Sequence, residues 1–329
     1  IEAGEADEAE AKAREKYQIG KKWEVRLTPM IIDAPEGTPQ VCPTCGEKDS
    51  FTEPRAFNMM FKNEVGAVAG ALAYLRRETA QGMFVNYENV QTTMRRKLPF
   101  GIAQVGKAFR NEIVTGNFTF RTREFEQMEI EYFCWPEQGA DCHQEWIDAR
   151  IAWYTRYGIK RENLDLYEHP DHKRSHYSTR TVDILYRFPI GFAELEGIAN
   201  RTDFDLTQHG EFSGKTLDYF DTKTERRVVP HVIEPSAGVD RNVLAFLTEA
   251  YEEEELVNQK GQKDVRTVLR FHPAMAPIKA AVLPLAKNRP ELVEYATSLT
   301  AELKPHYMTQ YDDTAAIGKL YRRQDEIGT

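Results

Sequence analysis

The 329-residue sequence contains few cysteines and no long run of apolar residues. Its four cysteines are too sparse for a disulfide framework, and they are typical of a protein in a reducing compartment. No apolar stretch reaches the length of about 18 residues that a membrane-spanning helix needs. Residues 1–16 are charged and alanine-rich, which is the opposite of a signal peptide. We therefore expect a cytoplasmic protein with no membrane partner.

The sequence also lacks a catalytic metal motif and an excess of positive charge. None of its 8 histidines stands in an HExxH arrangement, so a catalytic metal held by histidines is not expected. The formal net charge of −9 argues against unspecific nucleic-acid binding by the whole surface, although a local basic patch remains compatible with it. The chain has no initiator methionine and stops soon after a strongly patterned segment, so we expect it to be part of a longer protein.

Hydrophobic periodicity predicts strands and helices that do not alternate as βαβ units. An apolar stretch at 101–110, a turn at 115–117 and a period-two run at 118–133 predict a hairpin. Residues 141–157 show helical spacing and stop at Gly158, and Trp146 and Trp153 form a stripe typical of a core. Hairpins followed by helices indicate an antiparallel sheet backed by helices, an α+β fold. Further strands are expected at 181–187, 190–199, 217–221 and 228–234, and a solvated helix at 2–18.

The last third of the chain has a different pattern. A turn at 235–238 is expected to lead into a helix that continues to about residue 256. The polar segment 257–267 is interpreted as a linker. Beyond it the pattern predicts a small α/β domain with a parallel sheet. Its expected elements are a strand at 277–285, a helix at 290–303, a strand at 307–311 and a helix from about 314.

The predicted hairpin carries an unusual set of polar side chains. Residues two apart share a face of a strand, so Arg110 and Glu112 are expected to point the same way. The same holds for Arg121, Phe125 and Glu129, with Arg123 and Gln127 between them on the returning strand. Guanidinium groups bind phosphates, an aromatic ring stacks on a nucleobase, and a carboxylate holds an ammonium group. The pattern suits ATP with an amine-bearing substrate, and a solvated strand with cross-strand ion pairs remains the alternative.

Several segments resemble a known family. The run FRNE at 109–112, followed by Arg121, Phe125 and Glu129, resembles motif 2 of the class II aminoacyl-tRNA synthetases. The run AGVDRNVLAFL at 237–247 resembles their motif 3. From about residue 22 to 329 the chain is similar to glycyl-tRNA synthetase of the dimeric type. The other segments that carry this resemblance are 57–61, 74–90, 194–209 and 232–241.

The resemblance implies a domain order. Residues 1–56 would be an N-terminal helix and a Cys-x-x-Cys segment inserted in the catalytic domain. Residues 57–256 would be the class II catalytic domain, an antiparallel sheet flanked by helices. Residues 257–329 would be an incomplete α/β anticodon-binding domain. Motif 1, on which the family's dimer interface is built, is not found in the sequence, and Arg77, Glu88 and Gly116 depart from the family pattern.

The resemblance also implies roles for individual residues. Arg110 would hold the α-phosphate of ATP and the amino-acid carboxylate, and with Arg241 it would stabilise the transition state. Arg241 and Arg121 would reach the outer phosphates. Glu112 would accept from the adenine amino group, and Phe125 would stack on adenine. The position of Glu194 is that of a carboxylate for Mg²⁺, and the residues expected to frame glycine are Glu78, Glu129, Arg201, Glu234 and Ser236.

The family activity is the ligation of glycine to tRNA(Gly) with ATP and Mg²⁺, and the family forms homodimers. Glycine has no side chain to hold, so selection must rest on its ammonium group and on exclusion of anything larger. The reaction needs no protein nucleophile, so no covalent enzyme intermediate is expected. Two rival functions remain: another class II synthetase, such as one for proline, serine or threonine, and a non-catalytic relative that binds RNA or a protein partner.

Cys42 and Cys45 form half of a possible zinc site. A structural zinc ion needs four ligands, and the further candidates are Cys134, Cys142 and His143. Their spacing fits no familiar zinc pattern. We therefore expect a reduced turn at Cys42–Cys45, with zinc binding as the less favoured alternative.

Overall fold

The computed structural model describes residues 46–48, 57–68, 70–257, 261 and 263–329. The chain separates into two compact units, Ile1–Phe57 and Asn58–Thr329, and the elements described below belong to the second. The helix expected at 2–18, and Cys42 with Cys45, lie outside the described residues. Within the described residues, no helix has both the length and the apolar character needed to cross a bilayer.

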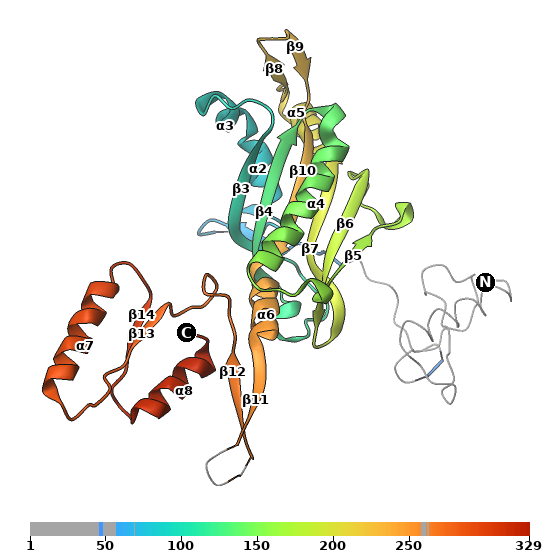
Figure 1. Cartoon of the computed structure of the whole chain (residues 1–329). Coiled ribbons are helices and arrows are strands. Elements are labelled where there is room, and N and C mark those ends of the chain that lie inside the picture. The colour runs from blue at the N-terminus through green and yellow to red at the C-terminus, as the bar shows by residue number, and fades with distance from the viewer. Residues whose placement is uncertain (1–45, 49–56, 69, 258–260, 262) are drawn as a thin grey trace. The chain divides into compact units, whose positions relative to one another are not determined.

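The centre of the second unit is a six-stranded sheet in which every strand is antiparallel to its neighbours (Figure 1). This confirms the antiparallel sheet expected from the sequence. The order across the sheet is β3 (Phe100–Phe109), β4 (Glu124–Cys134), β10 (His231–Gly238), β7 (Gly191–Thr202), β6 (Arg180–Phe188) and β5 (Leu164–Glu168).

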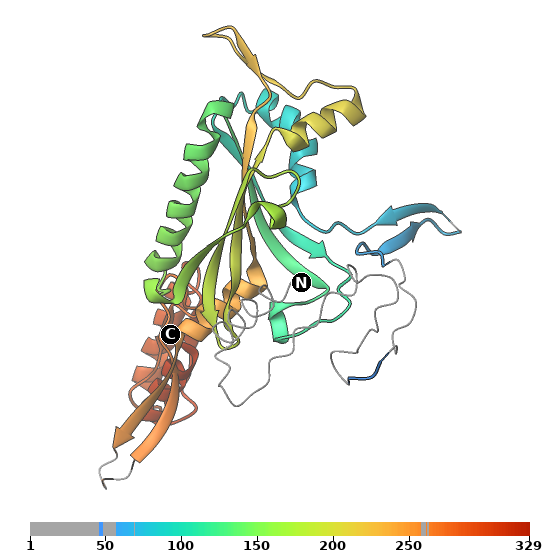
Figure 2. The same cartoon turned by 90° about the vertical axis from the view of Figure 1, so that its right-hand side faces the viewer.

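One face of the sheet is covered by α4 (Gly139–Arg156), which runs along the strands (Figure 2). Its apolar side chains, with Ile147 and Tyr154 fully buried, pack on inward residues of β6 and β7. Trp146 and Trp153 pack against this core, as expected from their helical spacing. The helix stops before Gly158, whose φ of +109° suits a residue without a side chain.

The other face carries α2 (Ala80–Val85), α3 (Tyr87–Thr93) and α5 (Phe204–Ser213). Phe84, Tyr87, Phe133 and Leu206 form a second buried cluster between these helices and the sheet. α6 (Val239–Ala250) follows β10 directly. Two short hairpins complete this part, β1 (Lys62–Val65) with β2 (Ala71–Tyr74) and β8 (Tyr219–Asp221) with β9 (Arg226–Val228).

A bulge in β7 sends two nearby glutamates to different surroundings. The register passes from Ile184–Glu196 to Leu185–Glu194, so Leu195 is an extra residue in β7. Without it, Glu194 and Glu196 would lie on the same face. Instead Glu196 lies under α4, where it accepts from Arg150 Nε and the Tyr154 hydroxyl, both at 2.7 Å. Glu194 stays half-exposed on the face that carries the polar residues described below.

The returning strand of the predicted hairpin starts later than expected. Phe118–Phe120 form a single 3₁₀ turn, and β4 begins only at Glu124. Asn117 and Phe118 have φ near +55°, a conformation incompatible with an extended strand. Arg110 and Glu112 follow the end of β3 and lie in the connecting loop, so the expectation that they share a strand face was wrong.

The helix expected to continue to residue 256 ends at Ala250. Residues Tyr251–Val257 form β11, which pairs with β12 (Lys263–Leu269), so part of the expected linker is also a strand. Four consecutive glutamates would repel one another on a helix. In the hairpin two of them pair with cations on the opposite strand, Glu254 with Arg266 at 2.8 Å and Glu255 with Lys263 at 3.0 Å.

The remaining elements agree with the expected α/β pattern. β13 (Ala280–Val282) pairs in parallel with β14 (Thr309–Tyr311), and both are shorter than the sequence suggested. α7 (Pro290–Leu303) joins them and has the bounds expected for this helix. α8 (Ile317–Ile327) follows β14.

The bulge gives a matched pair of substitutions. Glu196→Ala should lower the free energy of unfolding by about 3–5 kcal/mol, because it leaves the Arg150 charge buried without its carboxylate. Glu194→Ala, at a half-exposed position, should change it by about 1 kcal/mol or less. Urea unfolding followed by tryptophan fluorescence measures both. Equal effects of the two substitutions would contradict the separation of these side chains by the bulge.

Candidate active site

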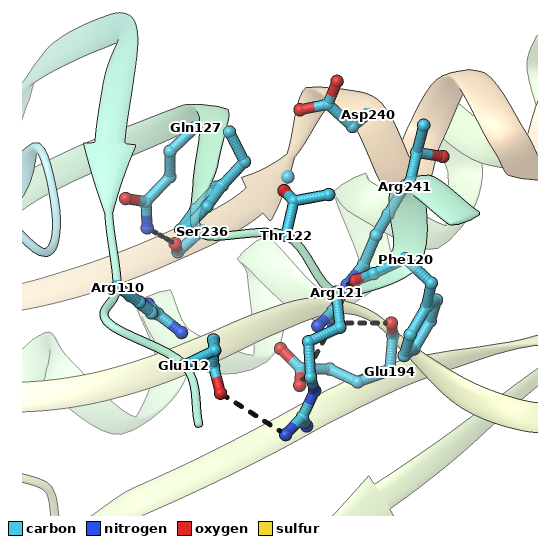
Figure 3. Close-up of a pocket in the computed structure, with 13 residues that line it drawn as sticks. Arg110, Glu112, Phe120, Arg121, Thr122, Gln127, Glu194, Ser236, Asp240 and Arg241 are labelled. Atoms are coloured by element: carbon cyan, nitrogen blue, oxygen red, sulfur yellow. Dashed lines mark hydrogen bonds and ion pairs between the residues drawn. The ribbon is translucent and has the colours of Figure 1, made fainter. Parts of the chain in front are cut away.

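A polar cavity of about 150 Å³ lies on the face of the sheet opposite α4 (Figure 3). Segments far apart in the sequence build it: the loop after β3, the strands β4, β7 and β10, and the first turn of α6. The residues that line it are Arg110, Glu112, Thr119, Phe120, Arg121, Thr122, Phe125, Gln127, Glu194, Ser236, Gly238, Asp240 and Arg241.

The strand register explains why these side chains meet. Phe125 and Gln127 are two apart on β4 and therefore share a face. Gln127 stands opposite Gly238, the last residue of β10. Arg241 follows in the first turn of α6, so the step from strand to helix brings its side chain over the end of the sheet (Figure 3).

Three guanidinium groups enter the cavity, each held by a different partner. Arg110 lies over the ring of Phe125, 5.3 Å from its centroid. Arg121 pairs with Glu112 at 3.6 Å. Arg241 stacks on Phe120 with its guanidinium carbon 4.2 Å from the ring centroid. Guanidinium groups are common partners of phosphates in proteins, and the carboxylates of Glu112, Glu194 and Asp240 line the same cavity.

Arg241 is the most firmly held of the three. Its Nε donates to the carbonyl of Phe120 at 3.1 Å, and its Nη1 donates to the carbonyl of Glu194 at 3.0 Å. The same Nη1 lies 3.3 Å from the Glu194 carboxylate. Figure 3 shows these contacts converging from the 3₁₀ turn Phe118–Phe120 and from β7. Arg241 therefore links three elements around the cavity.

Buried carboxyl groups gather around Arg201 beside the cavity, and we call this cluster of Glu129, Glu131, Asp205 and Glu234 the acidic pocket. The Arg201 side chain is only 2% exposed. It donates to both oxygens of Asp205, at 2.7 and 2.9 Å, and to Glu234 at 2.7 Å. The ring of Tyr177 stacks on the guanidinium at 4.1 Å. A guanidinium out of water requires such carboxylate partners, so these contacts fix β7, β10 and the start of α5 together.

Glu129 and Ser236 connect the acidic pocket with the cavity. The Ser236 hydroxyl donates to Glu129 at 2.8 Å, and Gln127 Nε2 donates to Ser236 at 2.8 Å and also to Glu129. The backbone N–H of Thr79 donates to the second Glu129 oxygen at 2.8 Å, and the Thr79 hydroxyl also donates to it. Ser236 and Gln127 themselves line the cavity, so the two regions are continuous.

The acidic pocket contains more carboxyl groups than cations. Burial raises the pKa of Glu234 to about 8; Glu129 and Glu78 add to this shift, whereas Arg201 opposes it. Glu131 lies on β4, two residues after Glu129, and is fully buried. Neither of its carboxyl oxygens has a hydrogen-bond partner among the described residues. Burial, followed by the charge of Glu234, raises its pKa well above the ordinary range. A site of this kind favours a cationic group such as an ammonium.

Every site residue predicted within the described part of the chain falls in one of these two regions. Arg110, Glu112, Arg121, Phe125, Glu194, Ser236 and Arg241 line the cavity. Glu129, Arg201 and Glu234 belong to the acidic pocket, and Glu78 is close enough to raise the pKa of Glu234. Their chemical roles stay predictions.

Several residues that hold the site together were not expected from the sequence. Asp205, Thr79, Phe120 and Tyr177 were not singled out, although Asp205 stands four residues after Arg201. Arg123, expected on the binding face, instead donates to the carbonyl of Glu112 at 3.0 Å and so holds the loop.

Cys134 and Cys142 are free and buried, and His143 Nε2 hydrogen-bonds the carbonyl of Ile198 at 2.9 Å. Over the described ranges, no group of three or more His, Cys, Asp or Glu side chains is arranged to hold a metal ion. Whether Cys42 and Cys45 bind zinc stays a prediction, because both lie outside those ranges.

The fold and the cavity define a class of protein. Residues 73–251, more than half of the chain, match the family model described as the tRNA synthetase class II core domain (G, H, P, S and T). The chain therefore belongs to the class II aminoacyl-tRNA synthetases of this group. A solved structure with a similar fold is the Giardia lamblia prolyl-tRNA synthetase in complex with prolyl-adenylate. Its TM-score is 0.60 at 13% identity, over 82% of this chain and 53% of that one.

The similar curated proteins are glycine–tRNA ligases. The chain is 56% identical to the enzyme of Thermobifida fusca over 293 residues, which cover 88% of this chain and 63% of that protein. It is 57% identical to the enzyme of Nocardia farcinica over 292 residues, which cover 87% and 62%. It is 55% identical to that of Mycolicibacterium vanbaalenii over 304 residues, which cover 90% and 64%. The chain thus spans somewhat less than two thirds of the length of these relatives.

The raised pKa of Glu234 predicts how stability depends on pH. Between the ordinary value of 4.5 and about 8, the folded protein holds a proton on this carboxyl that the unfolded chain has lost. The resulting stabilisation is complete below pH 4.5 and is lost as the pH rises to 8, by up to about 1.4 kcal/mol per pH unit. Urea unfolding at pH 5, 6, 7 and 8 measures this slope, and Glu234→Gln should reduce it. An identical slope in the variant would contradict the assignment.

Proposed function

We propose that this chain activates glycine with ATP and transfers the glycyl group to the 3′ end of tRNA(Gly). The observation that carries the proposal is that a cavity containing guanidinium groups lies beside a cluster of buried carboxyl groups, and that hydrogen bonds of Ser236 and Gln127 join the two. An amino acid has a carboxylate and an ammonium group only two bonds apart on its α-carbon. The high identity to proteins named glycine–tRNA ligase supports glycine as that amino acid.

In this proposal the acidic pocket binds the glycine ammonium. Glu129 and Glu78 supply negative charge, and Arg201 keeps Glu234 in position through the contact at 2.7 Å. Glu234 would lose its proton when the ammonium binds, because an opposite charge lowers the pKa of a carboxyl group. Buried carboxylates attract an ammonium more strongly than exposed ones because little water screens them. Ser236 and the buried side chains around the acidic pocket would exclude a larger amino acid in this proposal, which would favour glycine.

The cavity binds ATP in the same proposal. Arg110 holds the α-phosphate and the glycine carboxylate, while Arg241 and Arg121 hold the outer phosphates. Phe125 stacks on adenine, and Glu112 accepts from its amino group. The fixed position of Arg241 on Phe120 means that its charge needs little rearrangement during the reaction, which is the condition for effective electrostatic stabilisation.

Glu194 is the proposed carboxylate for Mg²⁺. Its side chain is half-exposed, reaches the cavity and offers oxygen donors, which Mg²⁺ prefers together with substrate phosphates. The residues therefore fit the ion. When bound there, Mg²⁺ would neutralise phosphate charge. Glu194 also pairs with Arg241, and this contact would keep the two groups near the same phosphates.

The proposed reaction has two steps without a protein nucleophile. An oxygen of the glycine carboxylate bonds to the α-phosphorus of ATP. The bond between that phosphorus and the oxygen that bridges to the β-phosphate breaks, and diphosphate leaves. A terminal hydroxyl of the tRNA then bonds to the glycyl carbonyl carbon, its proton is released, and AMP leaves. The protein contributes orientation and fixed charges, and no covalent enzyme intermediate forms.

The wider organisation is also part of the proposal. Residues 1–56 would form the inserted N-terminal segment, 57–256 the catalytic domain, and 257–329 the incomplete anticodon-binding domain that contacts tRNA(Gly). We propose a cytoplasmic homodimer, as expected for the family. The parallel pair β13–β14 with α7 and α8 supports an α/β domain at the C-terminal side.

Amino-acid-dependent exchange of pyrophosphate into ATP tests the proposed function. Glycine should support exchange, whereas alanine, proline, serine and threonine should support little. Exchange that depends on proline, serine or threonine would identify another class II synthetase. A chain that binds ATP but exchanges with none of the five amino acids would fit the non-catalytic alternative.

The two central arginines give a quantitative prediction. Arg110→Ala or Arg241→Ala should lower the rate of glycyl-adenylate formation by about 10²-fold or more, as is usual when a donor that stabilises transition-state charge is lost. Single-turnover formation of the adenylate measures this rate. Arg226→Ala is the matched control, since this arginine of β9 pairs with Glu137 and does not line the cavity. Near-normal rates in Arg110→Ala would refute its role.

The glycine pocket gives a separate prediction about substrate affinity. Glu129→Gln or Glu234→Gln should weaken the binding of glycine far more than the binding of ATP, because the lost carboxylate would face the ammonium in a mostly enclosed site. The Michaelis constants for the two substrates in the exchange assay measure this difference. Wild-type values for glycine in both variants would mean that these carboxylates are only structural.

A further inference from the structure

A short chain of hydrogen bonds leads from α5 to Glu78. His209 Nε2 lies 2.8 Å from the side-chain oxygen of Gln81. The amide nitrogen of Gln81 donates to Oε1 of Glu78 at 3.1 Å. Glu78 precedes α2 in a segment without regular structure, so its backbone alone does not fix its side chain. These two hydrogen bonds therefore orient the Glu78 carboxylate.

The chemistry of the amide fixes the direction of both hydrogen bonds. A carboxylate only accepts, so Gln81 must present its NH₂ group to Glu78. Its oxygen then faces His209 and also can only accept. His209 must consequently carry its proton on Nε2. A side chain without a donor at this point would leave the Gln81 amide free to turn away from Glu78.

The contact with α2 and the position on α5 both determine where the His209 side chain lies. Its ring packs against Phe84, a fully buried residue of α2, with the centroids 5.9 Å apart. His209 also follows Asp205 by four residues on α5, so the two side chains lie on the same face of the helix. Asp205 holds Arg201 directly, and His209 reaches the same pocket through Gln81. One face of α5 thus supports both the cation and an acid of the pocket.

We propose that His209 is a positioning residue that, through Gln81, holds Glu78 toward the ammonium group of the amino-acid substrate. This inference rests on the proposed function. It assigns His209 and Gln81 to amino-acid affinity rather than to ATP binding, because neither lines the cavity with the guanidinium groups. Glu78 also lies close enough to Glu234 to affect its ionisation, which places it beside the proposed ammonium site.

The decisive variant is His209→Phe. Phenylalanine retains a ring against Phe84 but has no donor for Gln81. The Michaelis constant for glycine in pyrophosphate exchange should rise about tenfold, the change that corresponds to 1.4 kcal/mol. The Michaelis constant for ATP and the maximal rate should change little. A purely structural role would instead be satisfied by the ring, so His209→Phe with wild-type glycine dependence overturns the proposal.

Gln81→Met tests the same relay from its middle. Methionine has a similar length and no hydrogen-bonding amide, so it should raise the Michaelis constant for glycine by a similar factor. Because the two hydrogen bonds act in series, the double variant should be no worse than either single variant. Additive effects would show that the two residues act independently and would overturn the relay. Gln208→Ala is the control, because the Gln208 amide donates to Glu211 and, among the described residues, to neither Gln81 nor Glu78, so both constants should stay unchanged.

The two proposals fail in different ways. Absence of glycine-dependent exchange in the unaltered chain would refute the proposed function. Normal exchange in the unaltered chain, with equal losses for glycine and ATP in His209→Phe, would refute the relay alone.

Discussion

The buried guanidinium of Arg201 is the interaction on which the rest of the site depends. A guanidinium that is 2% exposed has lost nearly all of its water, and this loss is offset only by well-placed carboxylates. Asp205 supplies two oxygens from the first turn of α5, and Glu234 supplies one from β10. The positions of a helix and two strands are thereby set by one side chain. The same contacts place Glu234 at the inner end of the proposed substrate pocket.

This arrangement buries more carboxyl groups than cations away from water. On β4 the positions of Glu129 and Glu131 alternate with apolar residues that face α4, so both carboxyl groups point to the same side as Glu234. Their surroundings differ. Glu129 receives hydrogen bonds on both oxygens, which suits a charged carboxylate, whereas Glu131 receives none from the described residues, which suits a protonated one. The strand therefore uses the same residue type, two positions apart, in different chemical roles.

The local hydrophobic pattern predicted much of this fold. It failed where backbone conformation or pairing between distant strands determines the structure. The antiparallel sheet, α4 and α7 follow from periodicity, because each buries one continuous apolar face. The start of β4 was misplaced because the positive φ of Asn117 and Phe118 is not visible in a period-two pattern. The hairpin β11–β12 was missed because its glutamates are stabilised by cations that arrive from the other strand. The site residues came from resemblance, but Asp205 and Tyr177 needed the fold, since their importance lies only in their contact with Arg201.

The polarity of the whole site gives the proposed substrate an orientation without any side-chain contact. Guanidinium groups gather at one end, with Arg241 fixed on Phe120, and buried carboxyl groups gather at the other, around Arg201. Between them stand the neutral donors Gln127 and Ser236, both of which bond Glu129. In the proposed complex a zwitterion would place its carboxylate toward Arg110 and its ammonium toward the acids around Arg201. Glycine has no side chain to bind, so these charges would align it with its carboxylate at the proposed position of the α-phosphate. The packing around Arg201 would then exclude larger amino acids.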